Sequence, residues 1–237
     1  RFADTSRGRP FAKDPAVVWF HDRYLMYYSV PPYGDGRAPD GWAIGVAASR
    51  DLSRWQRVGA LAAEHAYEQR GLCAPGALVR DGVVHLFYQT YGNGRDDSIC
   101  HAASEDGLRF ERNSTNPIFR PTGAWNCGRA IDADVILDGE RVLLYYATRD
   151  PAMEVQMLGV AQAPVRSVFD RAQWTQLGDG PILRPELPWE QACIEAPAVC
   201  RRGAVFGWVS GMTTSSEDDV QDDDEAQGDS RQWQSPA

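Results

Sequence analysis

The segment Asp14-Pro-Ala-Val-Val-Trp-Phe-His-Asp-Arg-Tyr-Leu-Met-Tyr-Tyr28 carries a pattern that the chain repeats three more times. Each copy opens with a small or acidic residue, runs into an apolar strand, turns at polar residues and enters a second strand. Apolar runs joined by a short polar turn are typical of a β-hairpin. The other copies, which begin about 60 residues apart, are Ala74-Pro-Gly-Ala-Leu-Val-Arg-Asp-Gly-Val-Val-His-Leu-Phe-Tyr88, Asp132-Ala-Asp-Val-Ile-Leu-Asp-Gly-Glu-Arg-Val-Leu-Leu-Tyr-Tyr146 and Glu195-Ala-Pro-Ala-Val-Cys-Arg-Arg-Gly-Ala-Val-Phe206.

Two more strands are expected after each of the first three hairpins. The third strand is rich in small residues, and the fourth contains a bulky aromatic residue. The third strands are expected at residues 42–49, 98–104 and 155–161, with a recurring small-residue motif at residues 44–49, 99–104 and 158–163, and the aromatic residues are Trp55, Phe110 and Trp174. Four antiparallel strands per repeat are typical of a β-propeller blade, which must pack against its neighbours around an axis to bury its faces. The sequence therefore predicts an all-β propeller.

The fourth copy begins like the others and then loses the pattern. No third strand follows it, and residues 212–237 contain eight acidic residues and a single Arg. Such a composition offers too little apolar surface to offset the entropy lost on ordering. We therefore expect an incomplete propeller domain at residues 1–210 and a disordered, acidic, low-complexity tail at residues 211–237.

The charge and cysteine patterns exclude several classes of function. The formal net charge is -9, but most of it lies in the tail, so the body has no basic stripe for nucleic acid. No apolar run approaches the ~18 residues of a membrane span. The five cysteines include no C-x-x-C pair, so no metal site is expected. The compartment and the oligomeric state are left open.

Three of the four copies open with a carboxylate, namely Asp14, Asp132 and Glu195. First strands of propeller blades line the central axis, so these residues are expected to meet at one end of it. Mutual repulsion in such a cluster raises at least one carboxyl pKa and leaves another group ionised. A protonated acid beside an ionised carboxylate is what cleavage of a glycosidic bond requires. The Ala74 copy shows that the repeat itself does not need a carboxylate there.

The motifs Lys13-Asp14-Pro15, Ile131-Asp132 with Asp138 six residues later, and Glu195-Ala-Pro197 occur in the order of successive blades. Together they resemble the five-bladed β-propeller glycosidases, above all glycoside hydrolase family 43. Residues 71–75, Gly-Leu-Cys-Ala-Pro, are similar to a neighbouring group, family 117. The resemblance covers roughly residues 11–200 and implies a five-bladed type of propeller, with three complete blades and a partial fourth in this chain.

The resemblance also implies an activity and a role for each carboxylate. The protein would be a glycosidase that hydrolyses O-glycosidic bonds of poly- or oligosaccharides, with a carbohydrate as its partner. Asp14 would be the general base, Glu195 the general acid, and Asp132 would orient Glu195 and help to keep it protonated. The expected outcome is inversion, with acid and base about 6.5–9.5 Å apart. No cofactor is required, although the resemblance allows a structural calcium ion on the axis.

Several other residues are candidates for the site. Arg129, Trp125 and Asn126 shortly precede Asp132 and are predicted to line a sugar subsite, because aromatic faces stack on sugar rings. His101, on a third strand, is a further candidate for substrate binding. Asp134 lies two residues after Asp132, hence on the same strand face, and competes with it for the orienting role.

Two rival functions remain at this level. A glycoside phosphorylase would need cationic side chains facing the pocket, for which Arg129 and Arg149 are the candidates. A non-catalytic carbohydrate-binding propeller or truncated pseudoenzyme would agree with the broken fourth copy, as would an enzyme that is inactive as this fragment. Fold alone does not decide between them.

Overall fold

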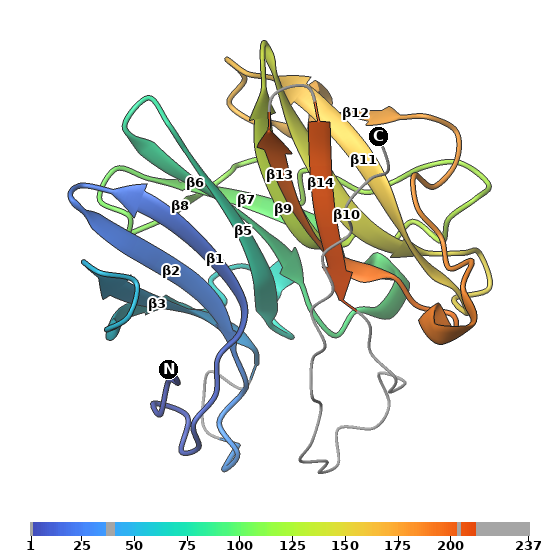
Figure 1. Ribbon diagram of the computed structural model, residues 1–237. Helices are drawn as coiled ribbons and strands as arrows, with labels where there is room; N and C mark the ends of the chain where they lie inside the picture. The colour runs from blue at the N-terminus through green and yellow to red at the C-terminus, as the bar shows by residue number, and fades with distance from the viewer. Residues whose placement is uncertain (1, 37–40, 203–204, 212–237) are drawn as a thin grey trace.

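The computed structural model describes residues 2–36, 41–202 and 205–211, with side chains described as far as residue 200. The predicted tail, apart from Gly211, lies outside the described residues. The described chain is all-β, as predicted, and contains three four-stranded antiparallel sheets and one two-stranded sheet (Figure 1).

Each sheet is formed by strands that follow one another in the chain. The first contains β1 (Lys13–Phe20), β2 (Arg23–Val30), β3 (Ala43–Ser49) and β4 (Gln56–Leu61). The second contains β5 (Leu72–Arg80), β6 (Val83–Thr90), β7 (Ile99–Ser104) and β8 (Glu111–Arg112). The third contains β9 (Ile131–Asp138), β10 (Arg141–Arg149), β11 (Gln156–Pro164) and β12 (Thr175–Leu177). The last contains β13 (Glu195–Arg202) and β14 (Val205–Gly211).

The helices of the described chain are short 3-10 turns in the connections. They are η1 (Ala66–Glu68), η2 (Gly94–Asp96), η3 (Arg171–Gln173) and η4 (Pro188–Glu190). Among the described residues, no helix is long and apolar enough to cross a membrane.

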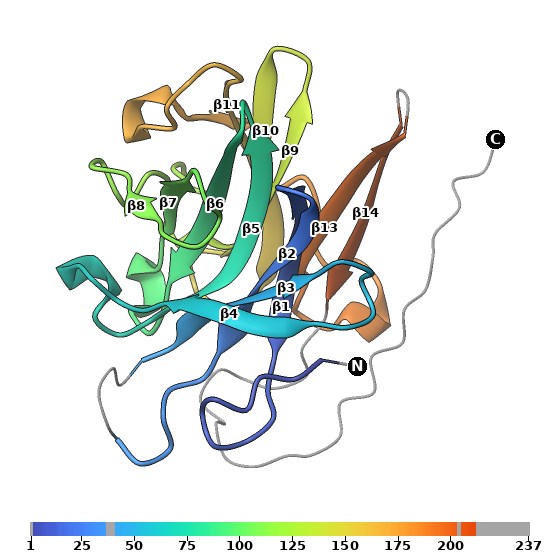
Figure 2. The same ribbon diagram turned by 90° about the vertical axis from the view of Figure 1, so that its left-hand side faces the viewer.

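The first strands of the four sheets lie together. β1 contacts β5, β5 contacts β9 and β9 contacts β13, so they follow one another around a common centre (Figure 2). This is the arrangement of propeller blades. The described chain therefore has three complete blades and the first hairpin of a fourth, as the sequence predicted.

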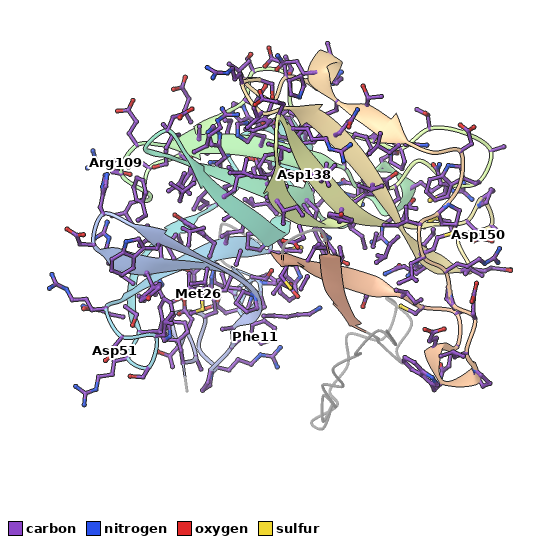
Figure 3. The ribbon with its side chains drawn as sticks, turned by 45° about the horizontal axis from the view of Figure 1, so that its top comes forward. Phe11, Met26, Asp51, Arg109, Asp138 and Asp150 are labelled. Carbon is purple, nitrogen blue, oxygen red and sulfur yellow. The ribbon has the colours of Figure 1, made fainter. Side chains whose placement is uncertain are left out.

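The hydrophobic core lies between neighbouring blades. Leu25, Tyr27 and Leu86 belong to the cluster between the first and second blades, and Phe87 and Phe169 to the cluster between the second and third. Full burial of one such side chain stabilises the fold by about 1.5–3 kcal/mol. Figure 3 shows the side chains that fill the space between the sheets.

A β-bulge opens every first strand. In the first blade, Lys13 pairs with Ser29 and the next pair is Ala16 with Tyr27, so Asp14 and Pro15 together oppose the single residue Tyr28. Corresponding register shifts occur in the other three hairpins. A bulge bends its strand and redirects side chains, which turns the residue at this position towards the blade junction.

The bulges share a left-handed backbone residue. The φ angle is 53° at Asp14, 45° at Ala74, 53° at Asp132 and 51° at Ala196. For residues other than glycine this conformation costs about 1–2 kcal/mol. The four equivalent positions are therefore Asp14, Ala74, Asp132 and Ala196.

This equivalence corrects the sequence alignment in the fourth blade. The alignment matched Glu195 with Asp14, whereas the structure matches it with Lys13, Cys73 and Ile131, one position earlier. The sequence alignment erred because it was anchored on side-chain charge, while the repeat is defined by the backbone of the bulge.

A buried tyrosine explains the small residues of the third strands. Tyr28 and Tyr146 lie opposite their bulges and are fully buried. A Cβ atom at Gly45 or Gly159 would lie 2.4 Å from the nearest atoms of the Tyr28 or Tyr146 ring, respectively. Glycine in the third-strand motif thus makes room for the tyrosine that backs the bulge.

Candidate active site

The three predicted carboxylates belong to β1, β9 and β13, and the structure brings them into one cluster. The charges of Glu195 and Asp14 both act on the Asp132 carboxyl group, and the backbone N–H of Ala196 donates to Asp132 Oδ2 at 3.4 Å. The charges of all three carboxylates also act on the Lys13 ammonium group. The starts of three first strands therefore form a single ionisable site.

Asp14 is held in place but remains open to solvent. Its Oδ2 accepts a hydrogen bond from Ser29 Oγ at 2.8 Å, and its Oδ1 lies 3.8 Å from Lys13 Nζ. Its side chain is 23% exposed. Ser29 Oγ in turn accepts from the backbone N–H of Ala74 at 2.8 Å, which ties the first blade to the second.

Lys13 supplies the positive charge of the cluster. Burial by itself favours the neutral amine, but the carboxylates of Asp14, Asp132 and Glu195 outweigh it and raise the pKa of Lys13. The ammonium group therefore stays charged beside the Asp14 carboxyl group.

Asp132 is the carboxyl group whose pKa is raised towards neutrality. Burial, followed by the charges of Glu195 and Asp14, raises the pKa of Asp132 to about 7, against the opposing effects of Lys13 and the Ala196 amide. Its backbone N–H donates to Gln89 Oε1 at 2.7 Å, so the second blade holds this position. At least one carboxyl pKa of the cluster is therefore raised, as the sequence predicted, and the structure places this rise on Asp132.

The charge on Asp132 should cost stability at high pH. Its native pKa lies above the unfolded value, so the folded state loses stability as pH rises through the range between them. We expect Asp132→Asn to raise the free energy of unfolding at pH 8 by about 2 kcal/mol, a gain that shrinks towards pH 4.5. Urea unfolding at both pH values measures it, with the exposed turn variant Asp81→Asn as control. An equal loss of stability at both pH values would contradict the assignment.

Glu195 lies at the start of β13 and is partly exposed. Its Oε2 accepts a hydrogen bond from Gln156 Nε2 of β11. Gln156 is 2% exposed, and its Oε1 accepts from Arg149 Nε at 2.8 Å. The third blade therefore fixes one carboxylate oxygen of Glu195.

Asp134 holds the fourth blade. Its Oδ2 accepts from the backbone N–H of Val199 at 2.5 Å. Burial raises the pKa of Asp134 to about 6, against the hydrogen bonds from Val199 and Val135 that lower it. Asp132 and Asp134 thus both accept hydrogen bonds from backbone N–H groups of β13. Each therefore contacts the strand that begins with Glu195, the residue that the sequence expected one of them to orient.

The candidates that precede Asp132 make contacts of their own. Arg129 is 1% exposed, and its Nη2 lies 3.5 Å from Asp97 Oδ2. Asn126 holds a turn, because its Nδ2 donates to Thr122 O at 2.7 Å and its Oδ1 accepts from Gly128 N at 2.9 Å. Trp125 is partly buried in the same loop. These contacts do not include the carboxylates of Asp14, Asp132 and Glu195. The sugar-binding role predicted for Arg129, Trp125 and Asn126 stays a prediction.

His101 lies in the core between the second and third blades. It is 3% exposed, its Nε2 lies 3.0 Å from His85 Nδ1, and its ring packs against Phe169 with centroids 5.1 Å apart. Burial, followed by His85 and Arg80, lowers the pKa of His101 to about 3. The structure therefore gives it a packing role as a neutral side chain, and its sugar-binding role stays a prediction without structural support.

Sequence reasoning missed the residues that hold the carboxylates. Ser29 and Gln89 are equivalent, each directly following the tyrosine opposite a bulge, and the third blade has Ala147 there. Aligning the ends of the second strands would have found this pair. Gln156 had no comparable signal, because its role depends on where the next blade begins.

A calcium ion on the axis has no evident set of ligands in the described part of the chain. No group of three or more His, Cys, Asp or Glu side chains there is arranged to hold a metal ion. The chemistry proposed below uses none.

Blades arranged around an axis, with carboxylates from three first strands meeting at one end, define a β-propeller with an acidic site of the glycosidase type. The sequence matches the glycosyl hydrolases family 32 N-terminal domain over residues 9–132, more than half of its length, and the chain belongs to this family. The match contains Asp14 and Asp132 and ends before Glu195.

Individual relatives agree with this family. The chain is 30% identical over 158 residues to raffinose invertase of Escherichia coli, which covers 57% of this chain and 32% of the relative. It resembles the structure of the Bombyx mori GH32 β-fructofuranosidase BmSUC1 with a TM-score of 0.68 and 16% identity, over 90% of this chain and 46% of that one. The chain therefore spans about a third to a half of these proteins.

The resemblance to family 43 identified the right fold and a neighbouring family. A thermostable family-43 glycoside hydrolase is similar with a TM-score of 0.63 and 20% identity, over 90% of this chain and 67% of that one. Sequence identity at this level supports only the shared propeller fold. The match to the family 32 N-terminal domain over residues 9–132 is what assigns the chain to family 32.

Proposed function

We propose that this chain is the catalytic propeller of a glycoside hydrolase that cleaves the fructofuranosyl bond of sucrose-like oligosaccharides. The observation that carries the proposal is the cluster of Asp14, Asp132 and Glu195, which combines a carboxyl group of raised pKa with an accessible, hydrogen-bonded carboxylate. Membership of family 32 and the similarity to an invertase and a β-fructofuranosidase support the choice of sugar.

Family membership changes the expected stereochemistry. Family 32 enzymes retain the configuration of the anomeric carbon, so the inversion expected from family 43 is not supported. Retention requires a carboxylate nucleophile and a second carboxyl group that acts first as acid and then as base. The same residues can serve, with Asp14 acting as nucleophile rather than as base towards water.

The contacts of each carboxylate support this division of roles. Asp14 is accessible, and it is held by a hydrogen bond from the Ser29 hydroxyl with the Lys13 ammonium group beside it. Asp132 carries a raised pKa and is a weak nucleophile near neutral pH. Glu195 is partly exposed, with one oxygen held by Gln156. It is the remaining group for proton transfer.

The reaction then has two steps. Asp14 attacks the anomeric carbon and forms an ester, while the proton that the neighbouring Asp132 and Glu195 carboxyl groups hold between them passes through Glu195 to the departing glycosidic oxygen. Water next attacks the same carbon, Glu195 takes a proton from it, and the Asp14 carboxylate leaves. Asp132 positions Glu195 through the Ala196 amide and keeps the total charge of the cluster low.

A phosphorylase receives less support from the site. Both of its candidate arginines make other contacts, Arg129 with Asp97 and Arg149 with Gln156. The positive charge beside the carboxylates is that of Lys13.

The test is a substrate panel with the purified protein. We expect release of fructose from sucrose or raffinose, and little or no hydrolysis of aryl arabinosides, xylosides and galactosides. Adding inorganic phosphate should not change the rate, whereas a phosphorylase would form a sugar phosphate. Binding of sugars without hydrolysis of any of these substrates would favour the carbohydrate-binding alternative and reject the proposal.

A further inference from the structure

Gln156 occupies a position that recurs in every complete blade. It lies two residues before the small-residue motif of the third strand, as Trp42 and Asp97 do in the first two blades. At each position the backbone carbonyl accepts a hydrogen bond from a backbone N–H group at the start of the next blade. The donors are Leu72 to Trp42 at 3.1 Å, Ala130 to Asp97 at 3.0 Å and Ile194 to Gln156 at 3.1 Å.

The backbone of Gln156 therefore fixes the segment that leads into Glu195. Its N–H donates to Ala192 O at 2.8 Å, and its carbonyl accepts from Ile194 N. Residues on both sides of Cys193 are thus tied to one residue of β11. The start of β13 cannot shift without breaking these bonds.

The side chain of Gln156 has only one workable orientation. Arginine has donors and no acceptor, so the amide oxygen must face Arg149 Nε, 2.8 Å away. The amide nitrogen then faces Glu195 Oε2, to which it donates. With the side chain 2% exposed, water competes little for these groups.

We propose that Gln156 is a positioning residue that selects the catalytic oxygen of Glu195. Its side-chain N–H group is hydrogen-bonded to Glu195 Oε2. Oε1 is therefore the oxygen that exchanges a proton with the substrate and with water. This inference rests on the proposed role of Glu195.

The test compares Gln156→Met with Gln162→Met. Gln162 is on the same strand and its Oε1 also accepts from an arginine, Arg141 Nη1 at 3.1 Å, so it is a matched control. We expect Gln156→Met to lower kcat/KM for sucrose by about 10- to 100-fold. The loss should be much smaller with β-fructofuranosyl fluoride, because fluoride needs little protonation to leave.

A second measurement does not depend on activity. Carbon-13 NMR of the labelled Glu195 carboxyl group, assigned by its absence in Glu195→Gln, should show a changed chemical shift in Gln156→Met and the parent chemical shift in Gln162→Met. If Gln156→Met fails to fold, Gln156→Glu retains an acceptor for Arg149 but loses the amide donor, so it should also change the chemical shift of the Glu195 carboxyl group.

The outcomes separate the two proposals. A changed carboxyl chemical shift in Gln156→Met of a protein that hydrolyses no glycoside would reject the proposed function and support the contact. Equal losses on sucrose and the fluoride, together with an unchanged carboxyl chemical shift, would overturn the role of Gln156. The Gln162→Met control is expected to match the parent protein in every measurement.

Discussion

Replacing Asp14 with asparagine is expected to lower kcat for sucrose by about 10⁴-fold or more. The amide cannot form the ester of the first step. Its oxygen can still accept from Ser29 Oγ, so the bulge and the contact with the second blade should persist. The rate of fructose release, measured with thermal unfolding, separates the lost chemistry from lost structure.

The control for this variant is Asp22→Asn, at the exposed turn between β1 and β2. It removes the same charge from the far end of the same hairpin and should leave kcat within about twofold. An Asp14→Asn protein with a tenth of the parent activity would show that Asp14 is not the nucleophile.

Glu195→Gln is expected to lower kcat for sucrose by about 10²–10⁴-fold, the usual contribution of a general acid or base. The first step should recover with β-fructofuranosyl fluoride, whose leaving group needs little proton donation. Azide, a nucleophile that needs no base, should then accelerate the second step. Initial rates with both substrates, with and without azide, measure separately how Glu195 acts as an acid in the first step and as a base in the second.

Glu186→Gln, an exposed change in the preceding loop, is the matched control and should behave like the parent protein. Equal losses on sucrose and on the fluoride, unaffected by azide, would remove Glu195 from proton transfer.

Much of the fold could be predicted because each repeat is encoded by short-range sequence patterns. The hairpin that begins near Asp14 and the strand that contains Gly45 follow from alternation, turn residues and small residues recurring in register. The position of Glu195 was misjudged by one residue. Only the backbone reveals that Ala196 has the φ of Asp14, because left-handed alanine and aspartate leave no mark in the sequence.

The site was predictable only in part for a related reason. Equivalent repeat positions identified Asp14 and Asp132, and the longer Glu195 side chain joins the cluster despite its offset. His101 and Arg129 have chemically suitable side chains, but both are buried in contacts between neighbouring segments. Such tertiary partners are invisible in a single sequence.

The stereochemical prediction failed at a different level. The short motifs around Asp14, Asp132 and Glu195 are shared across propeller glycosidases, so they indicated the fold and the carboxylates. They did not distinguish families 43 and 32, and the outcome of the reaction follows the family. Carboxylate identity alone does not tell a base that activates water from a nucleophile.

The most direct test is mass spectrometry of the protein quenched during turnover of a slow, activated fructosyl fluoride, followed by peptide mapping. Our account predicts a single fructosyl unit in ester linkage on the peptide that contains Asp14, and a first-formed sugar of retained configuration. An ester on another carboxylate, or an unlabelled protein that releases the inverted sugar first, would contradict it.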